Sequence, residues 1–140
     1  MKPVATTRRG NIWQAGLFAA LAALGLWAAG CATQTSEDRL EHVDQSNFDE
    51  RVLRAEMPVL VDFYADWCGP CRQLAPTLQA VADETPGVRI VKVNVDHSPK
   101  LANRYQIQAI PQLLLFKRGE LVGRERGLVG RRELRALVAQ

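Results

Sequence analysis

The most reactive side chains in this 140-residue sequence are two cysteines that stand two residues apart, Cys68 and Cys71. They enclose Gly69 and Pro70 and directly follow Trp67. A Cys-x-x-Cys pair can ligate zinc, form a structural disulfide, or exchange thiols and disulfides with another molecule. Each of these chemistries needs a different setting, so the surrounding sequence discriminates among them.

Zinc binding and a purely structural disulfide are the weaker interpretations. A structural zinc site needs four ligands, and downstream of residue 31 only His42 and His97 accompany the cysteine pair as nitrogen or sulfur ligands. A disulfide stabilises a fold by closing a loop of the unfolded chain, and the four-residue loop from Cys68 to Cys71 gains little from closure. We therefore expect a redox pair with no metal and no cofactor.

The pair stands where a buried strand is expected to pass into a helix. Residues 59–64 form a short apolar run typical of a strand buried on both faces, and a helix is expected from about Cys68 to Glu84. At a helix N-terminus Cys68 would face unsatisfied N–H groups, which favour a thiolate and make it the attacking sulfur. Pro70 loses no hydrogen bond in the first turn. Cys71, one turn further on, would resolve the mixed disulfide.

The remaining hydrophobic patterns alternate between strands and helices. We expect strands at residues 40–43, 88–95, 112–117 and 120–126, and helices at 46–55, 99–105 and 131–138. Ser46 and Gly130 are the expected N-caps, and Pro76 is expected to kink the helix that contains it. Strands and helices that alternate and then end in a hairpin and a helix predict an α/β fold with a mixed sheet.

From about Leu40 to Gln140 the chain resembles thioredoxin. Several separate motifs occur in the order found in that family: residues 61–71 (Val-Asp-Phe-Tyr-Ala-Asp-Trp-Cys-Gly-Pro-Cys), residues 92–96 (Lys-Val-Asn-Val-Asp), Ile110-Pro111, residues 116–119 (Phe-Lys-Arg-Gly) and Gly127. The resemblance implies a thioredoxin fold, in which a central five-stranded mixed sheet is flanked by four helices. It also implies a disulfide-exchange site at the edge of that sheet.

The resemblance implies a functional role for each residue that matches the family motif. Cys68 is implied to be the nucleophile and Cys71 the resolving thiol of one redox disulfide. Asp62 is implied to be a buried acid that helps to deprotonate Cys71, with Lys92 as its charged neighbour. A lysine in an alternating strand also fits a side chain that faces water, so this second role competes with simple exposure.

The resemblance further implies a groove for an extended substrate segment. Pro111 is expected to follow a cis peptide bond and to place the backbone of Ile110 beside Cys68, where the substrate pairs as an added strand. The expected substrate-binding residues are Trp67, Gly69, Pro70, Ile110, Pro111 and Gly127. Two positions depart from the family pattern: Tyr64 stands where many thioredoxins have Trp, and Gln112 stands where Thr is usual.

Residues 1–30 are typical of a signal peptide. Three cations, Lys2, Arg8 and Arg9, precede the nineteen uncharged residues 12–30, which end in small side chains before Cys31. This arrangement resembles the cleavage and acylation site of bacterial lipoproteins. It predicts a lipid on Cys31, a tether over residues 31–38 and a thioredoxin domain over residues 39–140. An uncleaved membrane anchor and a plain secretory signal, which would leave a soluble protein, stay open as alternatives.

The lipoprotein, the uncleaved anchor and the plain secretory signal all place the domain outside the cytoplasm. As a lipoprotein, it would be anchored to a membrane and would face the periplasm or the cell exterior. In such an oxidising compartment, acylation of Cys31 leaves Cys68 and Cys71 as a single pair. The formal net charge of +3 belongs to the first 30 residues, because residues 31–140 carry 15 charges of each sign. We therefore expect no nucleic-acid partner.

The predicted function is that of an extracytoplasmic protein-disulfide reductase, because Gly-Pro between the cysteines resembles the loop of reducing thioredoxins. Its expected partners are disulfide-containing proteins and a membrane electron donor, and we expect a monomer. Two other functions remain open at this point. The same fold serves oxidants and isomerases, because a difference of 30 mV between couples corresponds to only about 1.4 kcal/mol. A redox-silent module that binds peptides in the groove beside Pro111 is the third possibility.

Overall fold

The computed structural model describes residues 40–140. The predicted signal peptide, Cys31 and the tether lie outside the described residues, so those three expectations stay predictions. In the part of the chain that the structure describes, no helix has the length and apolar character needed to span a bilayer.

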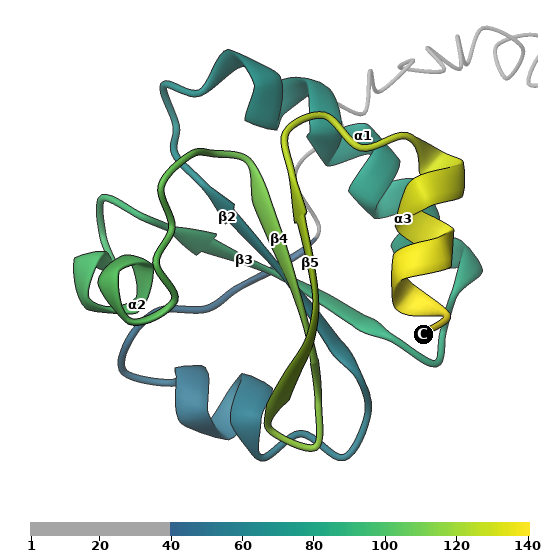
Figure 1. The fold of residues 1–140 in the computed structure, drawn as a ribbon, viewed down its shortest axis with the longest axis horizontal. Helices are drawn as coiled ribbons and strands as arrows, with labels where there is room; N and C mark the ends of the chain where they lie inside the picture. Colours follow the sequence, from purple (N-terminus) through teal and green to yellow (C-terminus); the bar gives the residue numbers. More distant parts are fainter. Residues whose placement is uncertain (1–39) are drawn as a thin grey trace, which may run out of the picture. The chain divides into compact units, whose positions relative to one another are not determined.

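One five-stranded sheet forms the centre of the fold (Figure 1). Its strands are β1 (Glu41–His42), β2 (Val59–Tyr64), β3 (Arg89–Asn94), β4 (Gln112–Lys117) and β5 (Glu120–Arg126). The helices are the short π-helix η1 (Asp49–Leu53), α1 (Gly69–Glu84), α2 (Pro99–Arg104) and α3 (Arg131–Val138). The strand order is β1-β3-β2-β4-β5. Strand β3 pairs in parallel with β1 and β2, whereas β4 pairs antiparallel with β2 and β5, so the predicted mixed sheet is confirmed.

The sheet is buried on both faces because side chains alternate along each strand. One face packs against α1 and α3, with Leu60 of β2 among its buried residues, and the other packs against η1 and α2, with Val61 of β2 among its own. Each side chain of this size contributes about 1.5–3 kcal/mol when it is fully buried. Figure 1 shows α1 and α3 side by side, and Arg131 and Arg135 of α3 both contact Glu84 at the end of α1.

The segment before η1 departs from the prediction. A helix over 46–55 capped by Ser46 is the sequence-based expectation, but the helix is confined to η1 and Phe48 is its N-cap, without a side-chain hydrogen bond. Ser46 instead donates its backbone N–H and its hydroxyl to the carboxylate of Asp44, and these bonds lower the pKa of Asp44. The N–H of Phe48 then donates to the carbonyl of Asp44. A local turn around Asp44 therefore forms in place of the predicted Ser46 cap.

Strand β3 agrees with its prediction as a central strand, because β1 and β2 flank it, although it is one residue shorter at each end than the predicted range 88–95. It is buried almost throughout. Lys92 is only 6% exposed, so the interpretation that this lysine faces water is wrong.

Candidate active site

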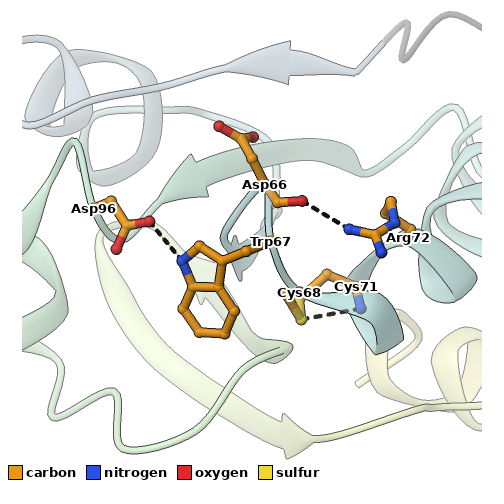
Figure 2. Close-up of a disulfide and its surroundings, with 6 residues drawn as sticks. All are labelled: Asp66, Trp67, Cys68, Cys71, Arg72 and Asp96. Atoms are coloured by element: carbon orange, nitrogen blue, oxygen red, sulfur yellow. Dashed lines mark hydrogen bonds between the residues drawn. A yellow bond between two sulfur atoms is a disulfide. The ribbon is translucent and has the colours of Figure 1, made fainter.

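Cys68 and Cys71 form a disulfide at the start of α1, as predicted. Cys68 is the N-cap, with an extended backbone, and its Sγ accepts a hydrogen bond of 3.2 Å from the N–H of Cys71 (Figure 2). The Cα atoms of the pair lie 5.3 Å apart, and both side chains are buried. Pro70 lies in the first turn, where a helix has no use for its missing N–H.

This position gives the two sulfurs different chemistry. The free N–H groups and the dipole of an α-helix favour negative charge at its N-terminus, and Cys68 stands there. This position favours Cys68 as the attacking sulfur of the reduced pair, and that role stays a prediction. Cys71 is the third residue of α1, and its side chain is buried to a similar extent as that of Cys68.

The strand-to-helix connection is held from both sides by side-chain hydrogen bonds (Figure 2). Nη1 of Arg72 donates to the carbonyl oxygen of Asp66 over 2.8 Å. Nε1 of Trp67 donates to Oδ2 of Asp96 over 2.9 Å, while 69% of Trp67 stays exposed. The indole is thus fixed in orientation and presents an apolar face to solvent beside Cys68, which suits contact with a bound segment.

Asp96 is a site residue to which sequence reasoning gave no role. It follows β3, and its backbone N–H donates to Oδ1 of Asn94 over 2.9 Å, which orients its carboxylate toward Trp67. A signal was present, because Asp96 ends one of the motifs shared with thioredoxin. The sequence alone does not reveal that residues 29 positions apart meet at the same sheet edge.

The predicted cis bond between Ile110 and Pro111 is present. The carbonyl of Pro111 accepts the N–H of Gly127 over 2.9 Å, and the φ of Gly127 is +76°, a conformation that favours glycine. Ile110 packs against the cluster that holds Cys68 and Cys71. Ile110 thus lies beside the disulfide, and Gly127 is hydrogen-bonded to the neighbouring Pro111. The role of these residues in binding a substrate segment stays a prediction.

Asp62 and Lys92 lie inside the sheet on the α1 side. They are register partners on β2 and β3 and so point to the same face. Asp62 is fully buried and Lys92 is nearly so. Since an isolated charge is very costly in such surroundings, burial favours either pairing or a neutral carboxyl. The structure places both residues where the resemblance implies them, and their roles stay predictions.

Gln112 is a second buried polar group near the site, on the opposite face of the sheet. It is register partner to Phe63 and immediately follows Pro111. Its side chain is fully buried, and within residues 40–140 neither amide atom has a hydrogen-bond partner. Over the same residues, no three His, Cys, Asp or Glu side chains converge as ligands for a metal ion.

Comparison with known proteins agrees with this geometry. Residues 39–140 match the family model described as thioredoxin. The chain is 41% identical to a thioredoxin of Acidithiobacillus ferridurans over 102 residues, which cover 72% of this chain and 94% of that protein. It is 45% identical to a thioredoxin of Chlamydia trachomatis over 98 residues, or 70% of this chain and 94% of that one. A thioredoxin of Streptomyces clavuligerus is 46% identical over 83 residues, 59% of this chain and 78% of its own length.

Proposed function

Because this chain belongs to the thioredoxin family, we propose that it is a protein-disulfide reductase that works outside the cytoplasm. Family membership and the disulfide at the Cys-x-x-Cys position make it a thiol-disulfide oxidoreductase. The reducing direction, the compartment and the individual residue roles are the proposal. The observation that carries it is the Cys68–Cys71 pair at the N-terminus of α1, with Gly-Pro between the sulfurs.

In the proposed cycle, the Cys68 thiolate attacks a substrate disulfide. A bond forms between Sγ of Cys68 and one substrate sulfur, and the other substrate sulfur leaves as a thiolate and takes up a proton. Asp62, as carboxylate, then accepts the proton of the Cys71 thiol, and the Cys71 thiolate attacks Sγ of Cys68. The mixed disulfide breaks, and the second substrate sulfur leaves as a thiolate and takes up a proton from solvent, while Asp62 loses its proton to solvent. Two electrons have then passed to the substrate. The disulfide in the structure is the oxidised end of this cycle.

Substrate binding is proposed to use the groove between the two loops at the disulfide. An extended segment would pair with the backbone of Ile110, next to cis-Pro111, and pack on the exposed ring of Trp67. Gly69 and Pro70 present the attacking sulfur to that segment, and Gly127 fixes the Pro111 carbonyl on the far side of the groove. Main-chain pairing accepts many sequences, so this mode suits a range of disulfide-containing proteins.

Anchoring and electron supply complete the proposal. Acylation of Cys31 would hold the domain, as a monomer, at a membrane outside the cytoplasm. There a soluble cytoplasmic reductase cannot reach it, so a transmembrane protein would have to supply the two electrons that restore the dithiol. If deletion of every candidate membrane donor left the pair reduced in cells, this part of the proposal would be wrong.

The first experiment is acid quenching of intact source cells, followed by alkylation of free thiols and mass analysis. Two peptides are measured: the one that holds Cys68 and Cys71, and the one that begins at Cys31. A reduced pair on an acylated chain is expected. An oxidised pair would overturn the reducing direction and favour an oxidant, and an uncut N-terminus would replace the lipid with a transmembrane anchor.

A Cys71→Ser variant supplies the partner test. It retains the attacking sulfur but cannot resolve the mixed disulfide, so substrates stay covalently bound at Cys68. The matched control is the double variant Cys68→Ser/Cys71→Ser, which should trap none. If this double variant also preserved the cellular phenotype of the parent protein, peptide binding rather than catalysis would be its function.

A further inference from the structure

A row of polar side chains crosses the α1 face of the sheet, from its edge to its centre. His42 on β1 is register partner to Lys92 on β3, and Lys92 is register partner to Asp62 on β2. Register partners point to the same face, so the three groups lie in line. Exposure falls along the row: His42 is exposed, Lys92 is nearly buried and Asp62 is fully buried. The row therefore leads from solvent to the proposed proton acceptor of Cys71.

Tyr64 connects the outer members of this row. Its hydroxyl and Nδ1 of His42 share a hydrogen bond of 3.1 Å, and the two rings meet edge to face with centroids 5.8 Å apart. Nζ of Lys92 lies 4.2 Å from the centroid of the Tyr64 ring. A cation at this distance over an aromatic face is attracted by the ring. Tyr64 also packs against the cluster that contains Cys68 and Cys71.

These contacts restrict the position of the Lys92 ammonium group. A lysine side chain carries a point charge on a flexible four-carbon stem, so burial alone does not determine where that charge lies. In surroundings of low polarity, the interaction of that charge with a nearby carboxyl depends steeply on position. The ring of Tyr64 fixes the ammonium, and the hydrogen bond to His42 fixes the ring.

We propose that Tyr64 and His42 are positioning residues for the resolving step, because together they hold the Lys92 ammonium in place while Asp62 takes the proton of Cys71. The inference rests on the proposed role of Asp62. It predicts a selective effect: the attack by Cys68 precedes that proton transfer and does not need the ammonium in place. Among the described residues, the titratable side chains in register on this face are His42 on β1, Lys92 on β3, Asp62 and Tyr64 on β2 and Glu125 on β5. Cys71 on α1 belongs to the cluster against which Tyr64 packs.

The test uses the purified full chain, reduced, and the aromatic disulfide dithio-bis-nitrobenzoate as substrate. Attack by Cys68 releases one coloured thiolate, and resolution by Cys71 releases the second, so stopped-flow absorbance separates the two steps. In Tyr64→Leu, which lacks the ring, we expect the second phase to slow about tenfold and its pH profile to shift, with less than about a twofold change in the first. Tyr64→Phe, which loses only the hydrogen bond, should slow the second phase about threefold, and His42→Gln, which also loses the ring contact with Tyr64, should slow it at least as much.

Two variants control this experiment. Tyr64→Trp keeps an aromatic face under the ammonium and should restore most of the resolving rate. His97→Gln removes the other histidine, which is exposed in the loop before α2, and should change neither phase. Equal slowing of both phases in Tyr64→Leu, or an unchanged pH profile of the second phase, would overturn the inference. The proposed role of Asp62 has its own test, because Asp62→Asn must slow the second phase whatever Tyr64 does.

Discussion

The two faces of the sheet share the same strands and differ in what they bury. On the η1 and α2 face, aromatic rings stack on an apolar layer: Phe116 meets Phe48 at 5.8 Å and Tyr105 at 5.3 Å between ring centroids, both edge to face. On the α1 and α3 face, Asp62 and Lys92 interrupt the apolar layer. Within residues 40–140 both faces hold an apolar core, and the α1 and α3 face also holds these two ionisable side chains. The proposed function assigns the proton transfer to that face and gives the η1 and α2 face no part in it, and the predictions below test this division.

The largest expected effect is a loss of stability when an aromatic ring is removed from the η1 and α2 face. Phe116→Ala removes a fully buried ring from the aromatic face and should lower the free energy of unfolding by about 3–5 kcal/mol. Denaturant unfolding measures the loss, and the rate of the resolving step in the folded protein should not change. Leu121→Ala, at a residue 40% exposed on β5, is the control and should cost less than about 0.5 kcal/mol. A large change in the resolving rate of Phe116→Ala would contradict the division.

A substitution on the α1 and α3 face should change the resolving rate of the reaction. Asp62→Asn keeps the shape of the side chain but removes the proton acceptor, so the resolving step should slow about a hundredfold at neutral pH. Stopped-flow release of the second coloured thiolate measures it. Asp66→Asn is the matched control, because Asp66 is exposed and only its backbone carbonyl contacts Arg72. Equal resolving rates in Asp62→Asn and the parent protein would remove Asp62 from the mechanism.

Gln112 is a buried polar residue on the η1 and α2 face, so replacing it tests whether a polar group lowers stability there. A buried amide without partners in residues 40–140 costs about 1–3 kcal/mol, and methionine has nearly the same volume. Gln112→Met should therefore raise the free energy of unfolding by about 1 kcal/mol or more. Thermal and denaturant unfolding both check this. Lower stability of the variant would show that the amide is satisfied by water.

The smallest expected effect lies outside both faces, at the Asp44 turn. The hydroxyl and backbone N–H of Ser46 hold the pKa of Asp44 below its usual value of 3.8. A carboxyl with a lowered pKa in the folded state stabilises the protein above its unfolded pKa and loses this effect as the pH falls through the folded value. Asp44→Ala should thus be slightly less stable than the parent at pH 6, and the difference should shrink below about pH 4. A difference that grows on acidification would contradict this sign.

Much of the fold was predictable because local signals agreed with the tertiary structure. The apolar run at 59–64 and the patterns at 112–117, 120–126 and 131–138 match β2, β4, β5 and α3. Cys68 and Gly130 begin their helices as expected. The prediction failed at Ser46, where the hydrogen bonds to Asp44 form a turn in place of the cap. The alternative that Lys92 faces water also failed, because the burial of β3 depends on flanking strands that a single segment cannot reveal.

For the site, the resemblance to thioredoxin implied roles for most of the residues described above, but it assigned none to Asp96 and did not predict the contacts between them. The disulfide, the cis bond before Pro111 and the proximity of Ile110 to the cysteines are confirmed. The bonds from Trp67 to Asp96 and from Tyr64 to His42 were not predicted, because each joins segments that only strand register brings together. Predictions on residues 1–39 stay predictions.

The short edge strand β1 has a further consequence. Over residues 40–140 it contributes only two residues to the sheet, and it pairs with one strand, β3. Segments with so few ladder contacts open locally at a lower free energy than the strands at the centre. Transient fraying of β1 would carry His42 away from Tyr64 while β2, α1 and the disulfide stay folded. Amide hydrogen exchange at Val43, whose N–H donates to Lys92, would report how often the outer support of the site is released.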